Sequence, residues 1–327
     1  MDLTNASILN ASILVTGGTG SFGTRFVETV LARHAPRRLA VFSRDELKQS
    51  EMQARLKHPA LRFFLGDVRD KERLIRAMHD IDIVVHAAAL KQIPACEYNP
   101  FEAIQTNVIG AKNVIDAAID SGVKRVIALS SDKAVNPINL YGATKLCAEK
   151  LFVQANTYGF ARGTHFACVR YGNVIGSRGS VIPLFHAQRA AGVVSVTDPK
   201  MTRFWITLQQ GVDFVARCLG LMRGGEIFVP KLPSTRILDL VEAVAPGCRV
   251  EFVGIRPGEK LHEVLISEDE ARQALELPEM FVVEPLSPTW GYQAWTDGRR
   301  LAGGYSYASD TNDHVLTPAE MRSLVDG

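Results

Sequence analysis

Short apolar runs alternate with helical stretches over the first half of the chain, and this alternation restricts the possible folds more than any other feature. The runs are rich in β-branched residues, and they span Ile13–Val15, Leu39–Phe42, Arg62–Leu65, Asp82–His86 and Arg125–Leu129. Strands that alternate with helices form right-handed βαβ units, and the parallel sheet built from such units is covered by helices on both faces. The sequence therefore predicts an α/β fold with a doubly wound parallel sheet.

Three stretches of the same region have helical periodicity: Phe22–Arg33, Phe101–Gly122 and Leu140–Tyr158. In the second stretch, apolar residues at spacings of three and four predict one buried stripe on the helix. The stripe consists of Phe101, Ile104, Val108, Ala111, Val114 and Ile115.

Turn-forming glycines become frequent after about Tyr171. We expect residues 1–170 to form a nucleotide-binding domain, to which some later segments return, and residues 171–327 to form mainly a smaller C-terminal substrate-binding region. Ligands of doubly wound sheets bind at the carboxyl ends of the strands, so the smaller region is expected to cover that edge. For the last forty residues the sequence predicts only an irregular surface extension.

The composition is that of an ordinary globular enzyme, with 46% hydrophobic and 22% charged residues among 327. A net charge of +2 provides no strong field for nucleic acid or an anionic membrane. No run approaches the ~18 apolar residues of a membrane span, and the N-terminus lacks the pattern of a signal peptide. The five cysteines are far apart and form no Cys-x-x-Cys, which is typical of buried reduced thiols. We expect a cytoplasmic protein without a metal, a membrane span or a nucleic-acid partner.

A glycine triplet, Gly17, Gly20 and Gly23 in ILVTGGTGSFG, follows the first strand and opens the first helix. Glycine allows a tight turn and close approach of a pyrophosphate, and the start of the helix offers free N–H groups. The alternative is a glycine-rich turn with a structural role only. In a strand–turn–helix context the triplet predicts dinucleotide binding and makes the expected sheet Rossmann-like.

The end of the second strand carries Ser43 and Arg44, with Lys48 one turn later. An acidic residue at this place is typical of NAD sites. A hydroxyl and two cations favour the 2′-phosphate of NADP, although Asp45 leaves NAD open and the cations alternatively form a solvated helix start. Other residues are assigned to the cofactor by their place at strand ends or in the glycine loop. They are Thr19, Ser21, Phe22, Asp67, Val68, Ala87, Ala88, Ala89 and Ser130; for the three alanines, close packing is the other reading.

Polar groups crowd the end of the strand Arg125–Leu129, which is unusual for a buried strand. Ser131 precedes Tyr141 and Lys145, which stand four residues apart on a predicted helix. The charge of Lys145 is expected to lower the pKa of Tyr141. A phenolate next to a serine hydroxyl takes a proton from a substrate hydroxyl while hydride leaves for a nicotinamide, so Tyr141 and Lys145 are also assigned to the cofactor.

Nearly the whole chain resembles the extended short-chain dehydrogenase/reductase superfamily. Within it, the chain is most similar to the soluble UDP-N-acetylglucosamine 4,6-dehydratases that invert C5, enzymes of the pseudaminic acid pathway. Ser131 stands where this group often has threonine, which preserves the hydroxyl. The matching runs are TGGTGSFG, SRDELKQSEM, RFFLGDVRD, HAAALK, SSDKAVNPINLYGATK, VRYGNVIGSRGSV, MTRFWIT, GGEIFVPK and IRPGEKLHE.

The resemblance implies a task for the neighbouring pair Asp132 and Lys133. Oxidation of the sugar at C4 makes the C5 proton acidic, and Lys133 then acts as the C5 base while Asp132 acts as the acid that helps the C6 hydroxyl to leave. Hydride returns to C6, giving UDP-2-acetamido-2,6-dideoxy-β-L-arabino-hex-4-ulose. We expect burial, together with the charge of Lys145, to keep Lys133 neutral, and burial to keep Asp132 protonated. Water and a mobile Lys133 are both open as the proton donor at C5.

The substrate UDP-N-acetylglucosamine needs groups for its diphosphate and uridine. A guanidinium suits the diphosphate and a carboxylate suits the ribose hydroxyls. The candidates lie in loops of the second half and after the fourth strand. They are Lys91, Asn173, Ser177, Arg178, Gly179, Ser180, Val181, Thr202, Arg203, Arg256 and Glu259. For Asn107, two roles are open, namely holding a water behind Lys145 and capping a helix bend.

Two other functions remain open from the sequence. A UDP-sugar C4 epimerase needs only the hydroxyl, the tyrosine and the lysine, and a non-catalytic NADP-binding module needs none of them. Asp132 and Lys133 favour the dehydratase over the epimerase, and the intact set of Ser131, Tyr141 and Lys145 disfavours the module. The resemblance also implies a homo-oligomer.

Overall fold

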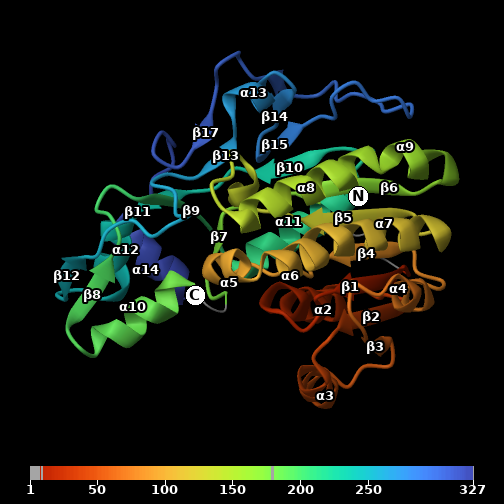
Figure 1. The fold of residues 1–327 in the computed structure, drawn as a ribbon, viewed down its shortest axis with the longest axis horizontal. Coiled ribbons are helices and arrows are strands. Elements are labelled where there is room, and N and C mark those ends of the chain that lie inside the picture. Colours follow the sequence, from red (N-terminus) through yellow and green to blue (C-terminus); the bar gives the residue numbers. More distant parts are fainter. Residues whose placement is uncertain (1–7, 9, 178–179, 327) are drawn as a thin grey trace.

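The computed structural model describes residues 8, 10–177 and 180–326 (Figure 1). A ten-stranded sheet runs through its larger part in the order β16-β14-β15-β10-β6-β5-β4-β1-β2-β3. The strands are β1 (Ser12–Thr16), β2 (Arg38–Ser43), β3 (Leu61–Leu65), β4 (Ile83–His86), β5 (Arg125–Leu129), β6 (His165–Val169), β10 (Ile227–Pro230), β14 (Ala274–Glu276), β15 (Met280–Val283) and β16 (Arg299–Arg300).

The seven strands from β3 to β10 are parallel, and β15, β14 and β16 extend the sheet in antiparallel fashion. The chain order reverses at β1, which pairs with both β2 and β4, and such a switch point opens a crevice at the carboxyl edge. The α/β, Rossmann-like doubly wound sheet predicted from the sequence is confirmed, and each of the five predicted strands is shifted by no more than one residue at either end.

Helices cover both faces of the sheet (Figure 1). On one face α2 (Ser21–Arg33) packs against α11 (Leu208–Leu221), and on the other α7 (Gly110–Asp120) lies between α4 (Lys71–Ala77) and α8 (Leu140–Gln154). The start of α11 is a capping box in which Thr207 and Gln210 satisfy each other's backbone N–H groups. Three further helices of this part are α3 (Glu46–Arg55), α5 (Ile93–Tyr98) and α9 (Asn156–Gly159).

The predicted single helix Phe101–Gly122 is wrong, because a π-helical turn interrupts it. The chain forms α6 (Pro100–Ile104), then the π turn Gln105–Ile109, then α7, and the amide of Gly110 donates to the carbonyl of Gln105. The wider turn rotates the residues before it relative to those after it. Phe101 is therefore 80% exposed and Ile104 38% exposed, so the predicted apolar stripe holds only from Ala111 onward.

A smaller lobe with its own hydrophobic core follows residue 171 (Figure 1, left). Its core includes Ile182, Phe185, Trp205, Leu240 and Met321. The lobe is built from β7 (Asn173–Val174), α10 (Val181–Arg189), β8 (Val193–Val196), β9 (Thr202–Ile206), β11 (Ser234–Arg236), α12 (Ile237–Val244), β12 (Arg249–Phe252) and α14 (Pro318–Asp326).

The last forty residues are not an irregular surface extension, and that expectation is wrong. Strand β16 joins the main sheet, β17 (Tyr307–Ala308) pairs with β13 (Val264–Ile266), and α14 packs on α12. Short strands of two residues carry too little periodicity to be recognised in a sequence. None of the helices in the described part of the chain is long and apolar enough to cross a bilayer.

The close contact of α8 with the turn after β5 requires a glycine at position 142. A Cβ there would lie 2.1 Å from the carbonyl oxygen of Lys133. We expect Gly142→Ala to force the two segments apart and to lower the free energy of unfolding by about 1–3 kcal/mol, as overpacking does. Denaturant unfolding of the wild type and the variant measures the loss.

The matched control is Gly303→Ala, because a Cβ at Gly303 meets no atom within 4 Å. Equal unfolding midpoints for the two alanine variants would contradict the proposed close contact.

Candidate active site

The glycine loop after β1 packs against the loop after β4. Gly17 has φ +66°, and a Cβ on it would lie 2.8 Å from the amide of Ala88, while a Cβ on Gly23 would lie 2.5 Å from the carbonyl oxygen of Gly17. Gly20 caps α2 without any side-chain hydrogen bond. The loop therefore presents backbone rather than side chains at the crevice, which fits a dinucleotide pyrophosphate.

Of the two cations predicted for a 2′-phosphate, Arg44 directly follows β2 and Lys48 lies in the first turn of α3. Both are paired with carboxylates in this structure. Arg44 lies 3.4 Å from Asp67, and Lys48 contacts Asp45. Burial raises the pKa of Asp67, but hydrogen bonds from Arg69 and the charges of Arg69 and Arg44 outweigh it and leave that pKa below its ordinary value. Arg44 is half exposed, so its pair with Asp67 is exchangeable for a phosphate.

Asn107 joins the loop after β4 to α8, a role that differs from both roles expected for it. Its Oδ1 accepts from the amide of Leu90 at 2.8 Å, and its Nδ2 donates to the carbonyl of Leu90 at 2.9 Å and to Thr144 Oγ1 at 3.0 Å. The π turn directs this amide inward. The half-buried residues Ala87–Ala89 are thereby held beside the glycine loop.

The residues after β5 form a short 3₁₀ turn, Asp132–Ala134, that buries its first carboxylate. Ser131 Oγ donates to Asp132 Oδ1 at 2.7 Å, and Lys133 Nζ donates to the same oxygen at 3.0 Å. The side chain of Asp132 is fully buried. Its other oxygen, Oδ2, has no hydrogen-bond partner among the described residues, so it is available to a ligand or a proton.

A second carboxylate, Glu263, lies 3.3 Å from Lys133 Nζ, and Asn173 Oδ1 lies 3.5 Å from it. Burial lowers the pKa of Lys133, but the charges of Asp132 and Glu263 outweigh burial and raise the pKa above its ordinary value. The expectation of a neutral Lys133 is therefore wrong for the ligand-free protein. The cation that opposes its charge is Arg203, not Lys145.

Tyr141 and Lys145 lie on α8 as predicted, but the charge that most lowers the pKa of the tyrosine is that of Lys133, not that of Lys145. Burial raises the pKa of Tyr141 to about 12, and the charge of Lys133 is the main opposing influence. Lys145 donates instead to the backbone carbonyl of Leu129, and burial lowers its own pKa. Ser131 lies close enough to Tyr141 to lower its pKa, and the Ser131 hydroxyl donates to Asp132 Oδ1.

Several predicted substrate residues line the same crevice from the smaller lobe. Thr202 Oγ1 lies 2.8 Å from His262 Nδ1 and 2.6 Å from Ser309 Oγ. Arg203 donates to the backbone carbonyls of residues 202, 260 and 261, and its Nε lies 3.8 Å from Glu263. The structure thus brings Asn173 and Arg203 to the Lys133 cluster itself.

The remaining predicted substrate residues that the structure describes lie after β4, before β13 and at the start of α10. Arg256 and Glu259 are 3.8 Å apart, and Glu259 Oε2 is buried without a partner in the described part of the chain. Burial and the charge of Lys133 lower the pKa of Lys91. Ser177 and Ser180 precede α10, which begins at Val181. The predicted residues 178 and 179 (Arg178, Gly179) lie outside the described residues.

Sequence reasoning missed Glu263 and Lys260. Both belong to the quoted run IRPGEKLHE, in which only Arg256 and Glu259 received roles. Lys260 donates to the backbone carbonyl of Val135 and so closes the loop over the turn after β5. A charged residue directly before a buried strand, as Glu263 is before β13, was the available signal.

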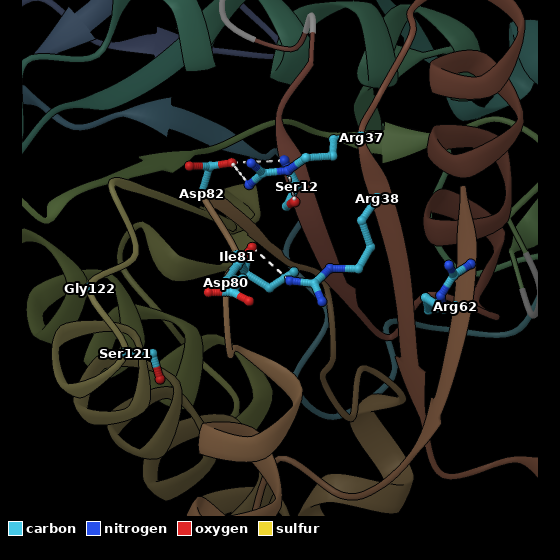
Figure 2. A pocket seen from close by; sticks show the side chains of 9 residues that line it. All are labelled: Ser12, Arg37, Arg38, Arg62, Asp80, Ile81, Asp82, Ser121 and Gly122. Carbon is cyan, nitrogen blue, oxygen red and sulfur yellow. Dashed lines mark hydrogen bonds and ion pairs between the residues drawn. The ribbon is translucent and has the colours of Figure 1, made fainter. Parts of the chain in front are cut away.

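A hollow of about 680 Å³ lies elsewhere (Figure 2). It is at the amino edge of the sheet, beside Ser12, the first residue of β1. Arg37 bonds to Asp82 at 3.1 Å, and Arg38 bonds to the carbonyls of residues 79 and 80. Protein acceptors hold both of these guanidinium groups at the edge of the hollow.

The fold and the site together define an extended short-chain dehydrogenase/reductase: a switch-point crevice, a glycine loop after β1, and Ser131, Tyr141 and Lys145 after β5. The polysaccharide biosynthesis protein family matches residues 13–285, and the chain belongs to this family.

Relatives with reported activities cover most of the chain. The "UDP-N-acetylglucosamine 4,6-dehydratase (inverting)" of Campylobacter jejuni is 47% identical over 96% of this chain and 97% of its own length. The "UDP-glucose 4-epimerase" of Rickettsia canadensis is 42% identical over 84% of this chain and 82% of its own length. The crystal structure of Pen from Bacillus thuringiensis superposes with a TM-score of 0.88 at 39% identity, covering 97% of this chain and 98% of that one.

The high pKa of Tyr141 is open to direct measurement. In the ligand-free protein we expect the tyrosine to remain a neutral phenol up to about pH 10, because burial disfavours the phenolate. NMR of protein labelled at tyrosine Cζ, with Tyr141→Phe to assign the signal, follows its ionisation. Lys133→Ala should raise the pKa further because a positive charge is lost, whereas titration near neutrality would contradict the described environment.

Proposed function

We propose that this protein is a UDP-N-acetylglucosamine 4,6-dehydratase that inverts C5, uses NADP and is a hydro-lyase. One observation carries the proposal: Lys133 and the buried Asp132 lie directly beside Ser131 and Tyr141 at the carboxyl end of β5. Oxidation at C4 alone does not need this second acid–base pair, whereas elimination across C5 and C6 does. The C. jejuni relative carries the same activity in its name.

The residues divide the reaction between them. The glycine loop after β1, with Gly17, Gly20 and Gly23, would hold NADP, which would supply acceptance of the C4 hydride and its return to C6. Tyr141, with Ser131, takes the proton of the C4 hydroxyl. Lys133 takes the C5 proton that the C4 ketone has made acidic, and Asp132 supplies a proton to the departing C6 hydroxyl. No net oxidation occurs, so a single bound cofactor serves repeatedly.

The choice of NADP rests on the cations after β2. Arg44 and Lys48 are each held by a carboxylate, and a phosphate is a stronger acceptor for both. We expect Arg44→Ala to weaken NADP binding at least tenfold, because a hydrogen bond to a charged group contributes about 1.5–3 kcal/mol. Calorimetric titration measures the change, and NAD on the same variant is the internal control. Equal loss for both dinucleotides would refute a 2′-phosphate contact.

The substrate is held by the smaller lobe. We assign the diphosphate to Arg256, Thr202 and Arg203, and the ribose hydroxyls to Glu259; Arg178 and Gly179 keep the substrate role that the sequence predicts for them. Lys91 and Asn173 face the sugar end, since both lie near Lys133. The buried and unpartnered Oε2 of Glu259 supports the ribose contact.

Mass spectrometry of the product with UDP-N-acetylglucosamine separates the candidate functions. We expect the loss of one water, and proton NMR in deuterated water should show deuterium at inverted C5. Lys133→Ala should still bind substrate but lose C5 exchange by at least a hundredfold, as expected for removal of a general base. An unchanged mass with altered stereochemistry indicates the epimerase, and no turnover at all indicates the binding module.

The epimerase remains the second candidate because of the R. canadensis relative, which is 42% identical. We also propose a homo-oligomer. Tyr98 (87% exposed) on α5 and Phe101 (80% exposed) on α6 are large apolar side chains only three residues apart, and such exposed apolar groups are typical of an interface. A cytoplasmic location and a place at the start of pseudaminic acid synthesis complete the proposal. The free cysteines support the reducing compartment.

A further inference from the structure

The amine of Lys133 lies between two buried carboxylates. Asp132 Oδ1 is 3.0 Å from Nζ and Glu263 Oε1 is 3.3 Å from it. The side chains of Asp132 and Glu263 are 0% and 3% exposed, and that of Lys133 is 23% exposed. Such a cluster stabilises an ammonium ion, yet a base at C5 must be an uncharged amine.

Glu263 is held in place by the C-terminal part of the chain. Its amide donates to Ser309 Oγ at 2.9 Å, and the amide of Ser309 donates back to its carbonyl at 2.8 Å. Ser309 follows β17, which pairs with β13 directly after Glu263. The carboxylate is thus fixed by a strand pair and does not depend on a mobile loop.

One oxygen of Glu263 is available for a proton. Oε2 is buried and has no hydrogen-bond partner within the residues that the structure describes, whereas Oε1 faces Lys133. Asp132 also has an oxygen without a partner among the described residues, Oδ2, but its other oxygen, Oδ1, already receives hydrogen bonds from both Ser131 and Lys133. A substrate that covers Lys133 removes its remaining exposure, and desolvation favours a neutral pair over an ion pair.

We propose that Glu263 is the positioning residue for Lys133: it fixes the amine beside Asp132 and accepts the ammonium proton when substrate covers the site. The step is Lys133–NH₃⁺ with Glu263–COO⁻ becoming Lys133–NH₂ with Glu263–COOH, so no proton enters or leaves the site. The free amine then takes the C5 proton, and the acid form of Glu263 retains the first one. This inference rests on the proposed dehydratase function.

The other charged and titratable groups around Lys133 come from five segments. Asp132 lies on the turn after β5, and Tyr141 lies on α8. The three cations are Arg203 on β9, Lys260 in the loop before β13, and Lys91 after β4. The three cations oppose an ammonium at position 133, and Asp132 favours it. None of the three cations can accept the proton while it is charged itself.

The test is C5 exchange of the purified 4-keto product in deuterated water with the NADP-loaded enzyme. This assay requires the C5 base but no hydride transfer. An internal proton transfer leaves the number of protons in the site unchanged, so the wild-type exchange rate should be flat between about pD 6 and 9. In Glu263→Gln the amine must lose its proton to solvent, so the rate should be lower and rise about tenfold per pD unit.

Two further variants serve as a conservative rescue and a matched control. Glu263→Asp keeps an acceptor and should restore a flat profile at a reduced rate. Glu268→Gln, which removes a carboxylate on the exposed face of α13 (Glu268–Ala271), should match the wild type. Unfolding midpoints of all variants confirm the folded state.

The results separate this inference from the proposed function. If the exchange rate of Glu263→Gln is lowered but independent of pD, Glu263 has a merely structural role. If the exchange rate of the wild type rises with pD, the proton leaves to solvent. Either result overturns the inference, while dehydration of UDP-N-acetylglucosamine by the wild type still stands. A wild type that neither dehydrates that substrate nor exchanges the product overturns both.

Discussion

A buried cluster of charges at the end of β5 is the constraint on which the site depends. A lysine placed between two carboxylates is satisfied only if all three groups are held within a few ångströms of one another, because any one of them left alone in the interior is costly. The turn after β5 supplies Asp132 and Lys133, and the strand pair of β13 and β17 supplies Glu263. The cluster therefore fixes the strand pair of β13 and β17 against the end of β5, at the place where we propose that the sugar lies.

The same cluster sets the electrostatic state of the neighbouring tyrosine. Lys133 favours the phenolate of Tyr141, whereas burial and Asp132 both disfavour it. Burial is the largest of these influences on the pKa of the tyrosine. Burial favours the protonated phenol of Tyr141, and the two carboxylates favour the charged amine of Lys133. Activation of both groups has to accompany the filling of the crevice, which removes water and changes the balance of charges.

The repeating strands and the glycine loop could be read from the sequence, because each rests on a local pattern of spacing. The five predicted strands, the helix that carries Tyr141 and Lys145, and the meeting of Ser131 with Tyr141 follow from such patterns. The π turn at Gln105–Ile109 could not, since a single extra residue leaves the apolar spacing nearly intact while it exposes Phe101. Glu263 was missed for a different reason: its partner Lys133 is 130 residues away, and only the tertiary fold joins them.

The strand pair of β13 and β17 has a consequence for how the protein matures. The dinucleotide crevice is formed by the first half of the chain, which leaves the ribosome early. Ser309, which bonds to the backbone of Glu263, is synthesised well after the strands that form this crevice. The carboxylate of the cluster is therefore fixed later than the crevice, and a product terminated before Ser309 would lack the contacts that hold Glu263.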